Sequence, residues 1–323
     1  MKIETLTLNP YQIPMTNGQI REGVVLHMTD TSGNSGWGEI APLPRWSLET
    51  LEQALLQLSQ YQSELLTIDW SPSTYAHQLQ QMNLFPSVLF GLEAALLSIL
   101  TPLPEHTVAT SALLMGSPQE ILHQANLRYT QGFRSAKLKV SNLTFKEAAD
   151  VIGRLKDRFH LRIDVNRAWD TSDSLRFFQQ FALDAFDYVE EPFQNPYELH
   201  LFSHPLAVDE SFPNPLSLSQ LEALPTLKAL IYKPTLQGGL LGCLPLHQWA
   251  TKNSIDVVLS SCFESAIGLC AIASMAHRLS LLEPIGIGTY HYLQESPSMD
   301  LLRFDRSHAI IKPKTICYSK ILI

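Results

Sequence analysis

The chain has 323 residues, which is enough for two domains or for one large barrel with an appended domain. Hydrophobic residues make up 45% of it and charged residues 17%, a mixture typical of globular proteins and too apolar for a disordered one. The net charge of −8 provides no basic field for a polyanion, so we expect neither a nucleic-acid partner nor an anionic-membrane partner.

The beginning of the chain alternates between apolar and polar residues as a strand does, and it lacks the continuous apolar stretch of an export signal. The longest uncharged run, residues 234–251, is interrupted by glycine and proline and is shorter than the ~20 apolar residues of a membrane helix. Cys243, Cys262, Cys270 and Cys317 have the spacing of neither a zinc site nor a disulfide framework. We therefore predict a cytoplasmic protein with reduced thiols and no membrane span.

The first hundred residues predict strands followed by helices. Residues 6–13, 23–29 and 36–40 have strand-like patterns separated by turns, which indicates an antiparallel meander. Apolar residues then recur at helical spacing after Ser47, a residue type that often caps helices. We expect helices over about 47–101.

From about residue 107 the pattern changes to short apolar runs, each followed by a helical segment, which predicts a parallel sheet. Eight runs are found, at residues 108–114, 136–140, 161–165, 188–189, 207–208, 230–232, 257–259 and 284–287. Eight units favour a (β/α)8 barrel, although an open doubly wound sheet has the same periodicity. No glycine-rich phosphate motif follows the first run, which argues against a nucleotide-binding sheet.

Charged and polar residues follow most of these runs, where a buried parallel strand would be apolar throughout. They are Lys137 and Lys139, then Arg162, Asp164 and Asn166, then Glu190-Glu191, Asp209-Glu210 and Lys233. Within each of the first two sets the residues are two apart, so they point to one side of the strand. One such residue alone would be read as a solvated rim charge or an ion pair. Charges at successive strand ends instead predict a catalytic site, because catalytic side chains converge at the carboxyl-terminal rim of a barrel.

Three consecutive runs each contribute one carboxylate, namely Asp164, Glu190 and Asp209. Oxygen-only ligation with open positions suits Mg2+, with Mn2+ as a substitute, rather than zinc. Lys139 and Lys233 would lie on either side of the ion. A dication and a second ammonium group nearby lower the pKa of a lysine, which makes it a usable general base.

The order Lys-x-Lys, Asp-x-Asn, Glu-Glu-Pro, Asp-Glu-Ser and Lys-Pro resembles the muconate-lactonising subgroup of the enolase superfamily, and within it the o-succinylbenzoate synthases of menaquinone biosynthesis. Other strings that carry the resemblance are 36–44, 91–96, 164–169, 233–236 and 260–265, so it spans most of the chain. It implies an α/β fold with a (β/α)8-type barrel at residues 104–300 and an α+β N-terminal capping domain at residues 1–103. A C-terminal tail, residues 301–323, is expected to return to the meander of the cap as an extra strand.

The resemblance also implies roles for individual residues. Asp164, Glu190 and Asp209 are the expected Mg2+ ligands, Lys139 is the expected acid/base, and Lys233 is expected across the substrate from it. The groups expected to support catalysis or bind substrate are Lys137, Arg162, Asn166, Ser260, Gly286, Gly288 and Arg21. Of these, Ser260 and the two glycines would lie near the carboxylate of a succinyl tail. The cap loops near 16–21 and 42–46 would close over the substrate and exclude water.

The reaction implied is the syn dehydration of 2-succinyl-6-hydroxy-2,4-cyclohexadiene-1-carboxylate, a small carboxylate, to o-succinylbenzoate. Lys139 would remove the proton alpha to the carboxylate and return it to the departing hydroxide, while protonated Lys233 would stabilise the enediolate. Because the enolate step is shared, the lysine pair alone does not separate this reaction from those of N-acylamino acid racemases, dipeptide epimerases and muconate cycloisomerases. Racemisation of N-succinylamino acids is the main alternative, since that substrate also ends in a succinyl carboxylate.

Three competing functions fit the residues less well. Dipeptide epimerases resemble one another in an Asp-x-Asp on the eighth strand, where this chain has Gly286-Ile287-Gly288. A Schiff-base aldolase on either lysine would leave three carboxylates without a role. A non-catalytic barrel conflicts with the presence of all five expected catalytic residue types.

Overall fold

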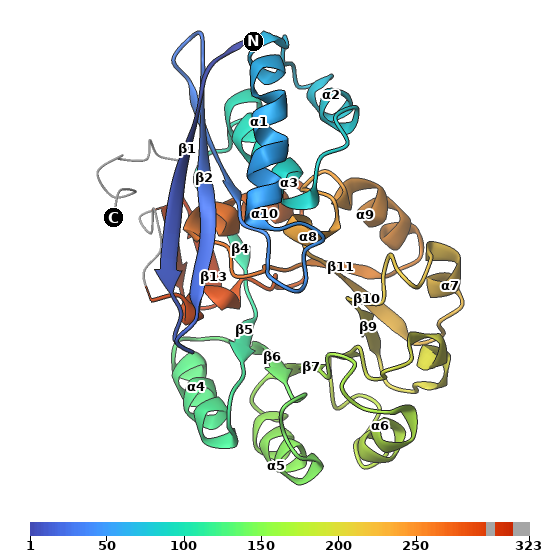
Figure 1. Cartoon of the computed structure of the whole chain (residues 1–323). Helices are drawn as coiled ribbons and strands as arrows, with labels where there is room; N and C mark the ends of the chain where they lie inside the picture. The colour runs from blue at the N-terminus through green and yellow to red at the C-terminus, as the bar shows by residue number, and fades with distance from the viewer. Residues whose placement is uncertain (295–300, 313–323) are drawn as a thin grey trace.

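The computed structural model describes residues 1–294 and 301–312. Its N-terminal part is an antiparallel sheet of order β1-β2-β3 covered by three helices (Figure 1). The elements are β1 (Ile3–Pro14), β2 (Ile20–Asp30), β3 (Ser35–Ile40), α1 (Leu51–Thr67), α2 (Tyr75–Gln80) and α3 (Pro86–Leu100). The predicted meander and the predicted helical segment after it are therefore confirmed.

Two glycines allow α3 to pack closely against β3. A Cβ atom on Gly38 would lie 1.9 Å from the carbonyl oxygen of Gly91, so only glycine permits this approach. The close contact leads α3 toward the barrel, where α3 also packs on α8 (Pro234–Gln237). In this way the capping part presents buried side chains to the barrel loops.

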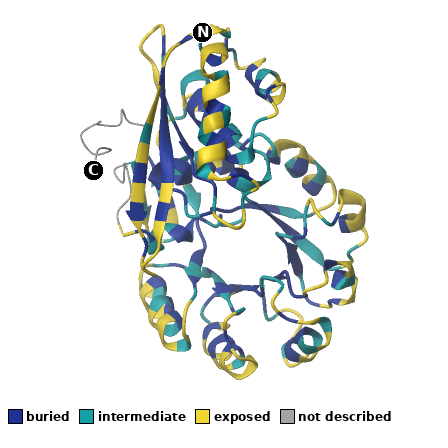
Figure 2. Ribbon diagram, in the orientation of Figure 1, coloured by how far each residue is buried: buried dark blue, intermediate teal, exposed yellow. Residues whose placement is uncertain are grey.

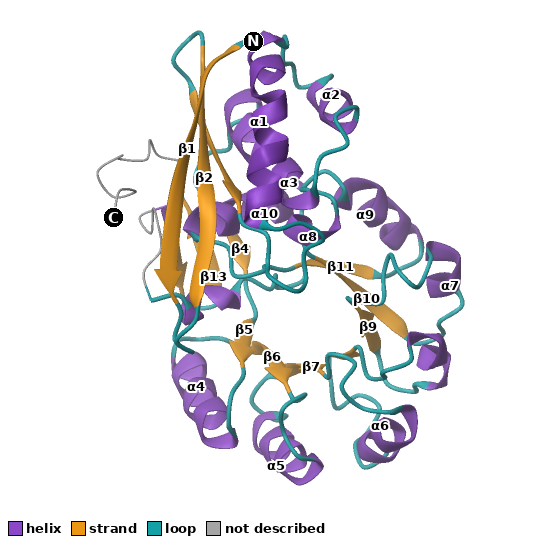
Figure 3. Cartoon of the chain, viewed as in Figure 1, coloured by secondary structure: helices purple, strands orange, loops and turns teal. Residues whose placement is uncertain are grey.

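Seven parallel strands form a curled sheet of order β11-β10-β9-β8-β7-β6-β5, with helices on its outside (Figure 3). The strands are β5 (Ala112–Leu114), β6 (Ser135–Lys139), β7 (His160–Asp164), β8 (Tyr188–Glu190), β9 (Leu206–Val208), β10 (Leu227–Tyr232) and β11 (Asp256–Leu259). The remaining helices of the barrel are α4 (Pro118–Thr130), α5 (Phe145–Leu155), α6 (Thr171–Phe178), α7 (Leu218–Glu222), α9 (Cys243–Lys252) and α10 (Ala266–Arg278), with 3-10 turns η1 (Pro196–Leu201) and η2 (Gly288–Tyr292). The α/β class and the barrel-type architecture are confirmed.

The eighth predicted strand, residues 284–287, is not a regular strand. It forms two isolated parallel bridges, Thr110 with Ile285 and Ser260 with Gly286, which join the two edges of the sheet. Pro284 lacks an amide donor, and a Cβ atom on Gly286 would lie 2.6 Å from Ser260 Oγ, so this crowded segment makes only single contacts. The ring is therefore closed by seven strands and a bridging segment.

The first predicted run and the predicted tail also differ from expectation. The run at 108–114 is divided between β4 (His106–Ala109) and β5, because the chain turns where Thr110 N donates to Ser307 O and Ser111 N donates to Ile285 O. The chain beyond residue 301 forms β12 (Leu302–Asp305) and β13 (His308–Ile311), and β13 pairs with β4. The expectation that the tail adds a strand to the meander is thus wrong for 302–311, and residues 313–323 lie outside the described part.

Burial follows the layers of the fold. The barrel strands are buried, while the outer faces of the surrounding helices are exposed (Figure 2). Within residues 1–294 and 301–312, the helices are all too short or too polar to cross a bilayer. Cys243, Cys262 and Cys270 carry free thiols, and Cys317 lies outside the described residues.

Candidate active site

One wall of the site is built by β6 and β7. Lys137 and Lys139 alternate along β6, so both side chains face the barrel interior beside Asp164 at the end of β7. Lys137 Nζ lies 2.9 Å from Asp164 Oδ2 and 2.6 Å from Glu190 Oε1, and Lys139 Nζ lies 3.4 Å from the same Asp164 oxygen. The two lysines therefore surround the carboxylate of the neighbouring strand.

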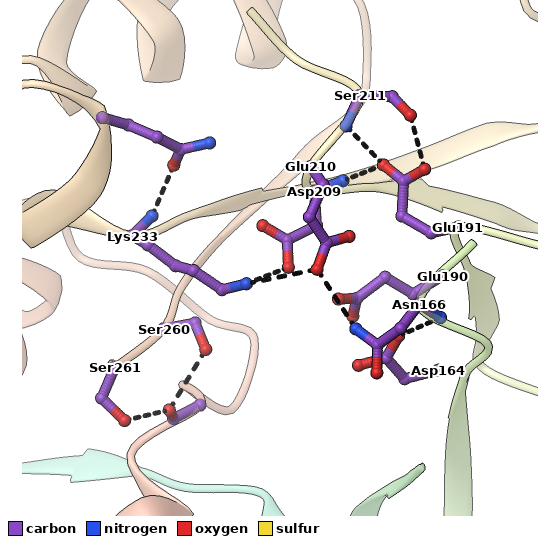
Figure 4. A network of polar contacts seen from close by, with 12 residues as sticks. Asp164, Asn166, Glu190, Glu191, Asp209, Glu210, Ser211, Lys233, Ser260 and Ser261 are labelled. Atoms are coloured by element: carbon purple, nitrogen blue, oxygen red, sulfur yellow. Dashed lines mark hydrogen bonds and ion pairs between the residues drawn. The ribbon is translucent and has the colours of Figure 1, made fainter. Parts of the chain in front are cut away.

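The opposite wall carries Lys233, directly after β10. Its ammonium group points toward Asp209 and Glu210 (Figure 4), forming an ion pair with Asp209 and lying 3.9 Å from Glu210 Oε1. Asn166 connects the two walls: its Oδ1 accepts a hydrogen bond from Lys139 Nζ at 3.1 Å, and its Nδ2 donates to Glu210 Oε1 at 3.1 Å. Lys139 and Lys233 are thus held at the two ends of one polar network.

Carboxylates gather between these lysines. Glu190, Asp209 and Glu210 each place an oxygen within 4.8 Å of the others. The Oε2 atoms of Glu190 and Glu210 are buried and have no hydrogen-bond partner in the described structure. With Asp164 beside them, four carboxylates face only three ammonium groups. Such a hard oxygen donor set, with unpaired buried acceptors and excess negative charge, fits a divalent cation such as Mg2+.

The pKa values reflect this crowding. Burial raises the pKa of Glu190 well above its ordinary value, and the charge of Asp164 adds to the increase. Burial also opposes ionisation of Asp164, but the ammonium groups of Lys137 and Lys139 outweigh it and lower the pKa of Asp164 to about 2. The pKa of Lys233 is raised, because Asp209 and Glu210 outweigh the effect of its burial. These two carboxylates therefore favour the protonated form of Lys233.

A cavity of about 130 Å3 opens beside this network. Lys137, Lys139, Asn166, Glu210 and Lys233 line it on the charged side. Its other lining residues include Ser260, Ser261, Gly286, Gly288 and Thr289 from the barrel, and Leu43 and Trp46 from the cap. A cavity lined by charged side chains, by small serine, glycine and threonine residues, and by the apolar side chains of Leu43 and Trp46 suits a small anionic ligand.

Comparisons with known proteins agree with this arrangement. A family model described as "Enolase C-terminal domain-like" matches residues 120–311, and one described as "MenC, N-terminal domain" matches residues 3–99. The o-succinylbenzoate synthase of Pasteurella multocida (strain Pm70) is 30% identical over 96% of this chain and 98% of its own length. That of Vibrio cholerae serotype O1 (strain M66-2) is 33% identical over 88% of each chain.

The chain belongs to the o-succinylbenzoate synthase family of the enolase superfamily. Solved structures confirm the fold of this family. An L-Ala-D/L-Glu epimerase from Bacillus subtilis has a TM-score of 0.84 at 20% identity, covering 96% of both chains. MenC from Desulfotalea psychrophila has a TM-score of 0.78 at 20% identity, covering 96% of this chain and 99% of its own.

For this member of the o-succinylbenzoate synthase family, the structure brings most of the predicted residues together. Lys137, Lys139, Asn166 and Lys233 line the cavity, as do Ser260, Gly286 and Gly288. Asp164, Glu190 and Asp209 are buried and contact the cavity-lining lysines. Ser260 and Ser261 both donate to the carbonyl oxygen of Gly286, at 3.3 and 2.9 Å.

Two of the residues predicted to support catalysis or bind substrate, Arg21 and Arg162, are not among the residues that line the cavity. Arg21 is buried, and its guanidinium donates to the backbone carbonyls of Ala41, Pro42 and Phe263, so it fastens the cap loop instead of lining the cavity. Arg162 is also buried, and it binds Asp187, Glu283 and the carbonyl of Pro284. It faces the same side as Asp164 but lies two residues earlier on β7, about 7 Å deeper in the barrel.

Two further acidic residues of this family member lie at the site but were not assigned a role from the sequence. Glu210 lines the cavity beside Asp209, because β9 ends at Val208 and the turn after it directs both acidic side chains inward. Glu191 accepts hydrogen bonds from Asp209 N at 2.8 Å and from Ser211 N and Oγ at 2.8 and 2.5 Å, which fixes that turn. The adjacent acidic residues Glu190-Glu191 and Asp209-Glu210 could have indicated them in the sequence. Strict strand alternation, however, places only one residue of each pair on the interior side.

The cap loops also differ in their placement. Leu43 and Trp46, from the loop at 42–46, line the cavity, and the ring centroid of Trp46 lies 6.0 Å from Lys233 Nζ. The loop at 16–21 contributes no residue to the lining among the described residues. In this family member, therefore, only one of the two predicted loops reaches the cavity.

Proposed function

We propose that this protein is an o-succinylbenzoate synthase of menaquinone biosynthesis, and hence a carbon–oxygen lyase. Relatives with that name match nearly the whole chain at about 30% identity, and a MenC N-terminal family model matches the cap. The observation that carries the proposal is the placement of Lys139 and Lys233 on opposite walls of one cavity, with a carboxylate cluster between them.

Asp164, Glu190 and Asp209 are the residues that would hold Mg2+, with Glu210 beside them. The grouping of Glu190, Asp209 and Glu210 and the unpaired Oε2 atoms of Glu190 and Glu210 support a cation beside these three residues. Asp164 is not in that group and is assigned because it is paired with Glu190 at the end of the neighbouring strand. When bound, Mg2+ supplies Lewis-acid stabilisation of the negative charge that develops on the substrate carboxylate. The ammonium group of Lys137 lies between Asp164 and Glu190 and would offset the electrostatic repulsion between these two carboxylates.

The two lysines divide the acid–base work. Lys139 is partly exposed to the cavity and would take the proton alpha to the substrate carboxylate. The same ammonium group would return that proton to the departing hydroxide, which leaves from the same face. Lys233 remains protonated and would stabilise the enediolate from the other face. Aromatisation of the ring then drives the elimination.

The rest of the cavity would orient the substrate. Ser260, Ser261, Gly286 and Gly288 form a wall that would face the succinyl carboxylate, and the serine hydroxyl groups would turn from the carbonyl of Gly286 to donate to it. Leu43 and Trp46 would cover the ring and exclude water. A cytoplasmic location, and action on a small carboxylate without a nucleic-acid or membrane partner, complete the proposal.

The test is incubation of the purified protein and Mg2+ with 2-succinyl-6-hydroxy-2,4-cyclohexadiene-1-carboxylate, followed by ultraviolet absorbance of the aromatic product. Parallel samples contain EDTA, or the Lys139→Ala variant, and a separate sample contains an N-succinylamino acid whose optical rotation is monitored. We expect metal-dependent product from the cyclohexadiene and none from the variant. Racemisation without any aromatic product would overturn the proposal in favour of a racemase.

A further inference from the structure

A glutamate of the capping part enters the barrel from α3. Glu93 is buried, and its Oε2 accepts hydrogen bonds from Leu240 N and, at 3.1 Å, from Leu241 N. Both donors belong to the barrel, just after α8, and no lysine, arginine or histidine of the described residues forms an ion pair with Glu93. Burial of a carboxyl group without a counter-ion is costly, and here the two backbone N–H groups of the barrel offset part of that cost.

The barrel is shaped to receive this carboxylate. Gly239 has a φ of +76°, and a Cβ atom there would lie 2.4 Å from Glu93 Oε2 and 2.9 Å from Leu89 Cγ. Only glycine combines this backbone conformation with this contact. The turn at Gly239 therefore fits α3 closely, with the carboxylate at its centre.

The same turn holds Lys233. Helix α8 begins directly after Lys233, and Gly239 N donates to Pro234 O at 2.9 Å, which closes the helix. Tyr232 Oη donates to the carbonyl of Gly239 at 2.9 Å. Lys233 is thus the first residue of a short, tightly bonded unit whose last residues are bound by Glu93.

A second contact anchors the start of that unit. Gln237 Oε1 accepts from Lys233 N at 2.6 Å, and Gln237 Nε2 donates to the carbonyl of Phe212 at 3.1 Å. Phe212 follows Asp209, the partner of the Lys233 ammonium group. The backbone of Lys233 is consequently held on one side by Gln237, which is bonded to the turn after Asp209, and on the other side by the α8 unit, whose end is bound by Glu93 of the cap.

The capping part makes a similar contact with the next βα unit. Glu39 of β3 is buried and accepts from Ser265 N at 2.8 Å, Ser265 Oγ at 2.5 Å and Gly268 N at 2.9 Å. These donors lie at the start of α10, after the loop that carries Ser260 and Ser261. Two successive barrel loops are therefore held by buried carboxylates of the cap.

We infer that Glu93 is a positioning residue for Lys233: it fixes the end of α8 from the cap, and thereby the position of the Lys233 ammonium group opposite Lys139. This inference rests on the proposed role of Lys233. A displacement of about 1 Å at a catalytic group costs on the order of 100-fold in rate, so a short α8 unit released at one end would be poorly active.

The experiment compares Glu93→Leu and Glu93→Gln with matched substitutions of Glu49. Glu49 is a buried cap glutamate that accepts from Ser87 N at 3.0 Å and Ser87 Oγ at 2.5 Å, so its contacts remain inside the cap. We expect Glu93→Leu to lower kcat by about 10- to 100-fold with little change in KM. Glu93→Gln keeps an acceptor oxygen and should retain most of the turnover. Glu49→Leu should lower stability without changing kcat.

A second measurement needs no substrate. Acetylation of Lys233 by acetic anhydride is followed by mass spectrometry, with Lys139 as the internal reference. In Glu93→Leu the Lys233 rate should rise several-fold relative to Lys139, and in Glu49→Leu the ratio should stay that of the wild type. If Glu93→Leu does not fold, Glu93→Asp, which shortens the side chain by one methylene group, should show the same changes.

The outcomes separate the two proposals. Wild-type kcat and wild-type labelling in folded Glu93→Leu or Glu93→Asp would overturn the positioning role. Equal losses of kcat in the Glu93 and Glu49 variants would also overturn it, since they would indicate a general effect of cap stability. If the wild-type protein does not convert the cyclohexadiene, the proposed function fails, while the labelling ratio still tests the contact between Glu93 and Lys233.

Discussion

Substitution of Gly239 by alanine tests the contact between the cap and the barrel from the barrel side. The backbone of Gly239 has a φ of +76°, and the new Cβ atom would lie 2.4 Å from Glu93 Oε2. A carbon and an oxygen cannot approach so closely, and the flexible side chain of Glu93 is the group that can move. We therefore expect Gly239→Ala to expel the carboxylate from its site.

The size of the effect follows from two contributions. The positive φ costs a residue with a Cβ atom about 1–2 kcal/mol. Displacement of Glu93 leaves the amides of Leu240 and Leu241 without their acceptor, at about 1–3 kcal/mol for each buried group. The free energy of unfolding should thus fall by about 3–8 kcal/mol, a large part of the roughly 5–15 kcal/mol typical of a folded protein.

Gly238 provides the matched control. Its φ is +116°, but a Cβ atom there would meet only Tyr232 Oη, at an ordinary 3.8 Å. Urea unfolding followed by circular dichroism should show a smaller loss for Gly238→Ala, about 1–2 kcal/mol from the backbone alone. Equal losses in the two variants would refute the reasoning, because they would show that the carboxylate contributes nothing at this turn.

Three further predictions concern the site and the pH dependence of stability. Lys139→Ala and Lys233→Ala should each abolish turnover while circular dichroism shows a folded protein; normal activity in either variant would contradict its catalytic role. Asp209→Asn tests the metal site: calorimetric titration should show that the Mg2+ affinity of the variant is reduced by about 100-fold or more, and unchanged affinity would exclude Asp209 as a ligand. EDTA treatment of the wild type should abolish its turnover. Glu93→Gln should flatten the pH dependence of stability. Burial raises the folded-state pKa of Glu93 to about 8, so its neutral form contributes stability that is complete below the ordinary pKa of 4.5 and is lost as the pH rises to about 8. Between about pH 6 and pH 8 the wild type should lose about 2 kcal/mol more than the variant in urea unfolding, and parallel losses would contradict this pKa.

The placement of the lysines on β6 beside Asp164 was predictable because its signal is local. A spacing of two on β6 places Lys137 and Lys139 on one side of the strand, and parallel pairing aligns Lys139 with Asp164 on the next strand. Strand alternation did not show that Arg162 lies away from the cavity, because alternation gives the side of the sheet that a residue faces but not its depth in the barrel. It also failed for Glu210, because the strand ends before the Asp-Glu pair and alternation no longer holds there.

Contacts between the cap and the barrel were not predictable in this way. Glu93 binds an amide 147 residues away, and Arg21 binds a carbonyl 242 residues away. In both cases the partner is a backbone group, which has no residue type and leaves no mark in the sequence. The glycine at 239 is a local trace of the first contact, but glycine is common in turns whether or not a side chain packs against them.

The order of strands explains how the site works as a unit. Moving across the sheet from β6 to β10, the polar side chains at the strand ends are amine, carboxylate, carboxylate, carboxylate and amine. Three strands separate the two outer amines, so in the proposed reaction the substrate would lie with one face toward each amine. The distance between the outer amines then depends on how far the sheet is curled. The contacts of Glu93 and Glu39 fix the loops that follow β10 and β11, where the curl is completed. By the positioning role inferred for Glu93, a cap that holds these loops would set the separation of the two amines, the quantity on which the proposed two-sided acid–base chemistry depends.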